Sequence, residues 1–431
     1  MHPINQSNIN ECKFGYLSHG RKHVIFSICN NAKYVLRCSR SSRSGNREAL
    51  NTYSSFSKMV FEKLLGTDTY STVLGESWCT LKLNRTTMKA LNEELQGLTN
   101  VFVECTFVRI ELNAHFSDAV NSFAEAKGSS ANAYFRFSAE IKPKSGVITQ
   151  SDFISEGNSA KKKISTYQLQ QRLKLSEHKV DRISKYDPAK LFFLSKEHIK
   201  KELHNLSDDP QNNLKIFLSA NNGRVKLAKD ALTIFKSESE SKFEDIIDHL
   251  ANVLSNKRSQ ALLKQIYNIQ AMDDFDIEGL VRMNFSKFVH DDRFFSMLSA
   301  KKMAADLELC GCKKVFGPIG PLGIDTLARL KQVAVNIQEG SDIDSLSDRE
   351  RILILRRFMV SKTAKDLSIV ITTIYPSKKS SIDDMNEIHN LPFDIRVVDT
   401  DFKPITKFDE WVQKDIDIMK ANSIPINQQE E

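Results

Sequence analysis

The sequence lacks long uncharged apolar runs, a patterned set of cysteines and the short motifs of covalent catalysis. No apolar stretch approaches the roughly 18 residues that a membrane-spanning helix needs, so none is predicted. The opening segment, MHPINQSNINE, has no apolar signal core, and the seven cysteines form no pairing pattern. Both absences lead us to expect the cytoplasm, the nucleus or both. Neither a G-x-S-x-G element nor a cysteine–histidine nucleophile pattern occurs, which argues against those hydrolase classes.

The composition shows a mild excess of basic residues. The 431 residues are 41% apolar and 27% charged, which is typical of a folded globular chain with room for two lobes. The 61 basic and 54 acidic residues give a net charge of +7, which favours anionic partners. Because the basic residues form no dense stripe, we expect small phosphorylated molecules as partners rather than a stable nucleic-acid or membrane partner. We also expect a monomer.

The first 145 residues have mixed β and α patterns with several strands, and the remainder is mainly helical. Strands are predicted at 24–28, 34–36, 102–112 and 134–141. Apolar residues recur at helical spacing over 246–269, which indicates core packing. Two more strands are predicted at 367–371 and 395–398. We therefore predict an α+β fold of two lobes, a smaller β-rich lobe at 1–145 and a larger helix-rich lobe at 146–431.

The clearest local motif is EIKPKSG, which begins at Glu140 at the end of a predicted strand. Residues two apart on a strand share a face, so Glu140, Lys142 and Lys144 are expected on one side. Two ammonium groups held together repel each other, and a polyanion between them relieves that repulsion. Pro143 restricts the backbone and Gly146 permits a sharp turn. Taken alone, such a motif is more often a strand end with solvated lysines.

This motif and five later segments resemble, in the same order, signature segments of the inositol-pentakisphosphate 2-kinases. The later segments begin at Tyr186, Pro210, Phe275, Thr363 and Val398, and the matches extend over residues 140–412. The resemblance implies a protein-kinase-like architecture in which the first lobe binds ATP. It also implies transfer of the γ-phosphate of Mg-ATP to the 2-hydroxyl of inositol 1,3,4,5,6-pentakisphosphate, which gives the hexakisphosphate (phytate).

Two aspartates carry the chemistry that the resemblance implies. Asp399 ends a predicted strand and corresponds to the magnesium ligand, and magnesium prefers carboxylate, phosphate and water oxygens. Asp366 corresponds to the residue that meets the acceptor hydroxyl and serves as its base, while Lys142 joins it in catalysis by stabilising phosphate. Without the resemblance, an aspartate at a strand end is more often a turn former or a helix cap.

The substrate demands many converging cations, because five phosphate monoesters carry about −8 to −10. By resemblance, the substrate-binding residues are Lys142, Lys144, Lys174, Asn212, Asn213, Lys403, Lys407 and Trp411. The last three recur four apart and share one face if that segment is helical. The family usually has arginine at Lys407 and tyrosine at Trp411, and lysine keeps the charge but loses the bidentate fork. Alone, these three read as a solvated helix face.

The residues that bind ATP are harder to identify from the sequence. We assign ATP binding to Gly20, Arg21, Arg37, Glu111, Asn113, Glu140 and Lys215. Gly20 is the single glycine of Ser18–His23, where the family has a GEGxxN loop. This stretch reads equally as a loop that cradles phosphate and as a plain β-turn. Arg37 corresponds to a phosphate-contacting basic residue, and Glu111 with Asn113 is expected at the hinge that meets adenine and ribose.

Two departures from the family pattern leave alternatives open. The family's RFxMHQ motif reads TYQLQQ at 166–171, and the run 161–163 of three lysines either compensates or is a solvated charge run. Cys310, Cys312 and His290 lie where plant and animal members hold zinc, but lack the usual C-x-x-C spacing, so structural zinc is not expected. The alternative functions are a non-catalytic inositol-polyphosphate-binding protein and a basic binder of nucleic acid or acidic membranes.

Overall fold

The structure is a computed structural model of the chain. It describes residues 8–19, 23–28, 31–40, 56–65, 79–96, 99, 103, 107–112, 117, 119–122, 134–192, 195–219, 225–228, 240–320, 322–338, 346–376 and 391–423. Within these ranges, no helix has both the length and the apolar character that a membrane crossing requires.

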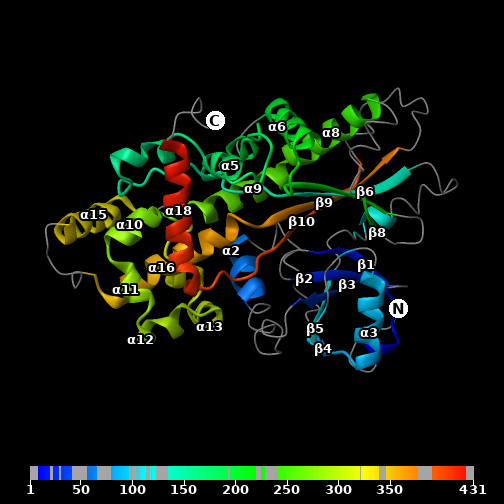
Figure 1. The fold of residues 1–431 in the computed structure, drawn as a ribbon, viewed down its shortest axis with the longest axis horizontal. Helices are drawn as coiled ribbons and strands as arrows, with labels where there is room; N and C mark the ends of the chain where they lie inside the picture. The colour runs from blue at the N-terminus through cyan, green and yellow to red at the C-terminus, as the bar shows by residue number, and fades with distance from the viewer. Residues whose placement is uncertain are drawn as a thin grey trace.

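A five-stranded antiparallel sheet forms the N-terminal part, in the order β1-β2-β3-β5-β4. Its strands are β1 (Phe14–His19), β2 (His23–Ile28), β3 (Asn31–Ser39), β4 (Cys79–Lys82) and β5 (Phe107–Leu112). In β2, alternate residues from Val24 to Ile28 are buried, as the sequence pattern predicts. Helix α3 (Arg85–Leu95) contributes Leu91 and Leu95 to the same small core (Figure 1).

A second five-stranded antiparallel sheet runs through the larger part, in the order β10-β9-β6-β7-β8. Its strands are β6 (Tyr134–Ile141), β7 (Leu214–Ser219), β8 (Val225–Ala228), β9 (Ser368–Pro376) and β10 (Phe393–Val398). The register places Ile141 opposite both Leu214 and Ile369, and Val398 opposite Ser368. The ends of β6 and β10 and the starts of β7 and β9 therefore meet at one edge of the sheet.

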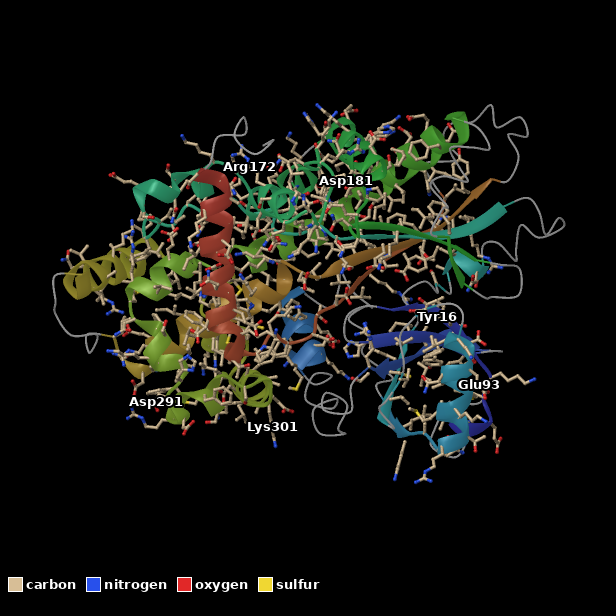
Figure 2. The ribbon with its side chains drawn as sticks, viewed as in Figure 1. Tyr16, Glu93, Arg172, Asp181, Asp291 and Lys301 are labelled. Atoms are coloured by element: carbon tan, nitrogen blue, oxygen red, sulfur yellow. The ribbon has the colours of Figure 1, made fainter. Side chains whose placement is uncertain are left out.

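Helices cover this sheet and build most of the larger part. On the side away from the N-terminal sheet lie α5 (Thr166–Ser176), α6 (Lys196–Asp208), α8 (Glu240–Ser255) and α9 (Lys257–Gln270) (Figure 1). The others are α2 (Glu62–Leu65), α10 (Asp276–Arg282), α11 (Phe285–Val289), α12 (Asp292–Phe295), α13 (Ala300–Cys310), α14 (Cys312–Phe316), α15 (Ile324–Gln338), α16 (Asp348–Ala364) and α18 (Phe408–Ser423). Their apolar side chains and those of the second sheet fill the main core (Figure 2).

The helical pattern over 246–269 has the predicted packing role. Leu262, Leu263, Ile266 and Ile269 of α9 are all buried. Asp187-Pro188 likewise begins a short 3-10 turn (Pro188–Leu191), in which the Asp187 carboxylate accepts a hydrogen bond from the N–H of Ala189. These local signals were readable because each depends on few neighbouring residues.

The α+β class, with a β-rich N-terminal part and a helical C-terminal part, is confirmed. The two sheets touch through a small apolar cluster in which Phe217 of β7 meets Leu17 and Val35. Strand β6 pairs with β7 and β9, so the expected lobe division after residue 145 does not coincide with the division between the two sheets. The lobes at 1–145 and 146–431 stay a prediction.

Gly146 is needed for close packing rather than for the sharp turn that the sequence predicted. Its φ does not lie in the left-handed region, and a Cβ built on it would clash with the ring of Phe192. Its N–H donates to Oε1 of the buried Gln270 at 3.0 Å. The EIKPKSG segment therefore passes tightly between the Phe192 ring and α9.

Replacing Gly146 with alanine is expected to destabilise the fold by about 1–3 kcal/mol, because the added methyl group must displace a buried aromatic ring. Thermal and denaturant unfolding measure this effect. Gly157→Ala is the matched control, since a Cβ there meets no atom within 4 Å. Equal unfolding midpoints for the two variants would contradict the packing role of Gly146.

Candidate active site

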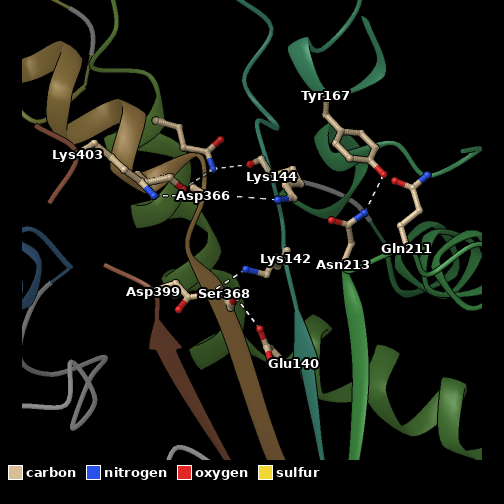
Figure 3. A network of polar contacts seen from close by, with 12 residues as sticks. Glu140, Lys142, Lys144, Tyr167, Gln211, Asn213, Asp366, Ser368, Asp399 and Lys403 are labelled. Atoms are coloured by element: carbon tan, nitrogen blue, oxygen red, sulfur yellow. Dashed lines mark hydrogen bonds and ion pairs between the residues drawn. The ribbon is translucent and has the colours of Figure 1, made fainter. Parts of the chain in front are cut away.

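Charged side chains of opposite sign meet at the edge where β6 and β10 end and β9 begins (Figure 3). Lys142 and Lys144 follow β6, Asp366 precedes β9, and Asp399 follows β10. Lys403 lies in the extended segment between β10 and α18. The register of the second sheet thus brings together side chains that are far apart in the chain. Lys142 and Asp399, for example, are separated by 257 positions in the sequence and are in contact.

Asp399 is held by two cations and a hydroxyl. Lys142 Nζ lies 2.9 Å from its Oδ2, Ser368 Oγ donates to the same oxygen at 3.1 Å, and Arg37 Nη2 is 3.7 Å from Oδ1. Burial alone would raise the pKa of the Asp399 carboxyl, but Lys142, Arg37 and Ser368 outweigh it and hold that pKa well below its ordinary range. Its φ of 62° is left-handed, a strained conformation that clusters at functional sites.

Asp366 is the second carboxylate of the edge. Lys403 Nζ lies 2.7 Å from its Oδ2 and Lys144 Nζ lies 3.5 Å from its Oδ1. Burial opposes ionisation, but the two lysines lower the pKa of Asp366 below its ordinary value. Half of its side-chain surface remains exposed (50%), so a bound molecule can reach it.

Lys144 reaches the site by a route that strand alternation does not predict. Strand β6 ends at Ile141, and Lys144 has a left-handed φ of 52°, so its side chain is not carried there by the pleat. Burial lowers the pKa of the Lys144 ammonium, Asp366 raises it, and the like charges of Lys142 and Lys174 lower it further. The net shift of this pKa is downward, because burial and the two like charges outweigh the single carboxylate of Asp366.

Gln270, at the end of α9, holds the backbone of both segments and was not predicted as a site residue. Its Nε2 donates to the carbonyl oxygens of Lys144 at 2.7 Å and Ala364 at 3.1 Å. Because Ala364 stands two residues before Asp366, this fully buried amide ties the lysine segment to the aspartate segment. The available signal was a polar residue directly after the apolar face of the 246–269 helical pattern.

Glu140 and Ser368 extend the site toward β7. The Ser368 hydroxyl lies 3.0 Å from Oε1 of Glu140 and 3.1 Å from Oδ2 of Asp399, and Lys215 Nζ lies 3.6 Å from Oε2 of Glu140. Two carboxylates that share one hydroxyl form an oxygen-rich donor set. This set suits Mg²⁺, which takes a few carboxylate oxygens and completes its shell with phosphate and water.

Arg37 connects the first sheet to this edge. It lies on β3, and its guanidinium is 3.7 Å from Asp399 and 3.4 Å from Oδ2 of Asp401. Only 12% of its side chain is exposed. A cation from the N-terminal sheet therefore faces the same carboxylate as Lys142 does from the second sheet.

Amide and amine groups from neighbouring elements flank the charged edge (Figure 3). Lys174 on α5 lies 2.9 Å from Oε1 of Gln211, and Asn213 donates through Nδ2 to the hydroxyl of Tyr167 at 2.9 Å. Asn213 is buried, and its Oδ1 accepts no hydrogen bond from the described protein atoms. Asn212 is exposed beside it.

Lys407 and Trp411 have other neighbours in the structure. Lys407 pairs with Glu410 at 2.9 Å, and the Trp411 ring packs on Phe358 with 5.6 Å between centroids. Because α18 begins at Phe408, Lys403 precedes the helix, and the condition under which all three share a helix face is not met. Their roles toward a substrate stay predictions.

Comparison with known sequences identifies the family. A sequence model of inositol-pentakisphosphate 2-kinases matches residues 16–417. The chain belongs to the inositol-pentakisphosphate 2-kinase family. The resemblance that was read from six short segments is thereby confirmed.

Three relatives in this family illustrate how far the match extends. Inositol-pentakisphosphate 2-kinases of Oryza sativa subsp. japonica and Arabidopsis thaliana are each 26% identical, over 292 and 299 residues, or 64% of this chain and 58% of each relative. The Danio rerio enzyme of that name is 41% identical over 78 residues, which is 18% of this chain and 16% of that relative. The chain thus matches 58% of the length of its plant relatives.

In this member of the inositol-pentakisphosphate 2-kinase family, three of the residues assigned to ATP binding lie outside the described residues. Gly20, Arg21 and Asn113 fall in segments that the structure does not describe. Glu111 lies in β5, opposite Val35 of β3, and its side chain is not described. Arg37, Glu140 and Lys215 are the three assigned residues that the structure brings to the charged edge.

The lysine run at 161–163 is only partly a solvated charge run, because Lys161 is buried while Lys163 is exposed. Its Nζ contacts the carboxylate of Asp276 and lies 3.2 Å from Glu278 and 3.0 Å from Asp415. Burial raises the pKa of Asp276 to about 6, against the pull of Lys161. Since Lys161 is paired with three carboxylates, it is not available to compensate for the altered motif at 166–171.

Within the described residues, the carboxylates of Asp276, Glu278 and Asp415 lie near enough to one another to share a metal ion. Lys161 occupies the space between them, which explains their clustering without an ion. Of the three residues considered for zinc, Cys310 is exposed and Cys312 is half-buried, and His290 Nε2 lies 3.0 Å from Asp409.

Replacing Lys161 with methionine is expected to destabilise the protein by about 3–5 kcal/mol at neutral pH, because buried carboxylates lose their partner. The deficit should shrink as the pH falls toward and below about 6, because burial raises the pKa of Asp276 to about 6 even beside Lys161, and loss of that cation raises it further, so protonation relieves the repulsion in the variant. Denaturant unfolding at several pH values measures both effects, with the exposed Lys163→Met as control. A deficit that grows on acidification would contradict this account.

Proposed function

We propose that the protein is an ATP-dependent kinase that phosphorylates the 2-hydroxyl of inositol 1,3,4,5,6-pentakisphosphate and releases the hexakisphosphate and ADP. The observation that carries the proposal is the pair of ionised carboxylates, Asp366 and Asp399, at a lysine-rich sheet edge. Each carboxylate has its own cations, so each suits a separate task. Family membership supports the same chemistry.

Asp366 suits the acceptor side of the reaction. Its carboxylate is half exposed and stands between Lys144 and Lys403, so a hydroxyl that donates to it has a cation on either side for the neighbouring ring phosphates. With its lowered pKa, Asp366 is a weak base. It therefore orients the hydroxyl first and receives the proton as the new O–P bond forms, which fits the loose transition state of phosphoryl transfer.

Asp399 suits the donor side. With Glu140 it would hold Mg²⁺, which when bound would supply positive charge for the phosphate groups of ATP. Lys142, 2.9 Å from Asp399, adds an ammonium group for the transferring phosphate, and Arg37 brings a guanidinium from the first sheet. Lys215, beside Glu140, adds a further cation on this side.

The two carboxylates also favour a kinase over a simple polyanion binder. A site that only retained an inositol polyphosphate would lose affinity from each negative group that faces it. Asp366 and Asp399 lie directly among the lysines, where they neutralise charge that a binding module would use.

We further propose that the protein is a monomer and that it works in the cytoplasm or nucleus, without a nucleic-acid or membrane partner.

Asp399→Asn and Asp366→Asn are expected to lower kcat at least roughly a hundredfold, because each removes a group that acts mainly in the transition state. Binding of the pentakisphosphate should be kept or tightened, because a negative charge has been removed. Turnover by product separation and binding by calorimetry measure the two quantities.

Asp409→Asn is the control, because Asp409 is exposed on α18 and pairs with His290. An Asp399→Asn protein that turns over at the wild-type rate would contradict the assignment of Asp399 as a magnesium ligand. Loss of binding in parallel with loss of turnover would instead indicate that the aspartates only maintain the fold of the site.

A further inference from the structure

Lys174 is held differently from the lysines inside the charged edge, which contact the carboxylates of Asp366 and Asp399. Its Nζ contacts the amide Oε1 of Gln211 at 2.9 Å and lies 5.8 Å from the centroid of the Tyr167 ring. Among the described residues, Lys174 forms no ion pair with a carboxylate. A neutral oxygen orients an ammonium group without cancelling its charge, so Lys174 keeps its charge for an anion.

The turn that carries Gln211 is joined to the lysine segment of the charged edge. The Asn213 N–H donates to the carbonyl oxygen of Pro210 at 2.7 Å, which closes the turn, and the Lys142 N–H donates to the carbonyl oxygen of Asn213 at 2.8 Å. Figure 3 shows Gln211 and Asn213 together at the margin of the network of charged residues. The contact with Gln211 therefore places the Lys174 ammonium group beside the candidate active site.

The other end of the Gln211 amide has two hydrogen-bond acceptors. Its Nε2 donates to Oε1 of Gln171 at 2.9 Å and to Oδ2 of Asp209 at 3.2 Å. An ionised carboxylate only accepts hydrogen bonds, so Asp209 fixes the amide with its nitrogen on that side and its oxygen toward Lys174. Gln171 is fully buried, which gives this network a rigid support.

Gln211 thus separates an ammonium group from a carboxylate. Lys174 and Asp209 contact opposite ends of one amide, and opposite charges this close attract each other. Burial first, and then Lys414, lower the pKa of Lys174, and the charge of Asp209 opposes both. The Gln211 backbone has a left-handed φ of 44°, which is costly for a residue with a side chain, and the contacts of its amide help to hold it there. Without that amide, Lys174 would be free to turn to Asp209.

We propose that Gln211 is a positioning residue for substrate binding, whose amide directs Lys174 to a ring phosphate and keeps Lys174 from pairing with Asp209. This inference rests on the proposed function, because the ligand is the inositol polyphosphate that Lys174 would bind. Asn212 and Asn213 are predicted to meet the substrate directly. Gln211, in the same segment, acts through Lys174 instead.

The first test is Gln211→Met in the full chain, because methionine is unbranched and of similar size but makes neither amide contact. The KM and the Kd for the pentakisphosphate should rise roughly three- to tenfold as Lys174 turns to Asp209, while kcat changes less than twofold. Adding Asp209→Asn should restore most of the affinity, because Lys174 then has no carboxylate to turn to. A double variant that binds as weakly as Gln211→Met would overturn the proposal, since a merely structural role of Gln211 would not be rescued at Asp209.

The second test asks whether Gln211 acts through Lys174. In a Lys174→Met background, Gln211→Met should change the Kd less than roughly twofold, because the group that it positions is already gone. Equal losses in the two backgrounds would overturn the proposal. Gln413→Met is the matched control, since Gln413 is exposed on α18 and its Nε2 also donates to an aspartate, Asp417, at 2.8 Å.

The proposed function and the role of Gln211 fail in different ways. Wild-type protein that binds the pentakisphosphate, with a Gln211→Met variant that binds it equally well, would overturn the role of Gln211 and leave the proposed function standing. Wild-type protein that binds no inositol phosphate would overturn both. A Lys174→Met variant with wild-type affinity would also overturn the role of Gln211, because that role requires Lys174 to meet the substrate.

Discussion

Repulsion between lysines held at one edge of the second sheet is the constraint on which the rest of the structure depends. Lys142 and Lys144 are kept close by the two-residue spacing of their motif, and each is partly buried. Asp399 and Asp366 offset this cost, but burial first, and then the charges of Lys142 and Lys174, still leave the pKa of Lys144 below its ordinary value. The folded protein therefore keeps positive charge that a polyanion can neutralise, which links stability to substrate binding.

The surroundings of this edge hold the charged groups in place. Gln270 joins the Lys144 and Ala364 carbonyl groups, and the register of β6, β9 and β10 sets the distance between the lysine and aspartate segments. Lys161 also ties α18 to the rest of the larger part through Asp415. Site geometry thus depends on buried polar contacts whose loss is costly, because each would leave an unpaired group.

Local signals in the sequence predicted much of this arrangement. Strand β6 and the aspartate at the end of β10 follow from alternation and β-branched runs, and six ordered segments indicated the family. Three features could not be predicted, because they depend on partners distant in the chain. These are the burial of Lys161 among carboxylates, the clamp made by Gln270, and the clash that reserves position 146 for glycine. A lysine run or a lone glutamine looks the same in sequence whether it is solvated or buried.

The most direct test of the account is to incubate the purified chain with Mg-ATP and inositol 1,3,4,5,6-pentakisphosphate and to separate the products by anion exchange. Because the substrate has a single free hydroxyl, formation of the hexakisphosphate with equimolar ADP would establish both the activity and its position. The account predicts that product. Tight binding of the pentakisphosphate with no hexakisphosphate would contradict it, and would mean that the carboxylates at the lysine edge serve binding or folding alone.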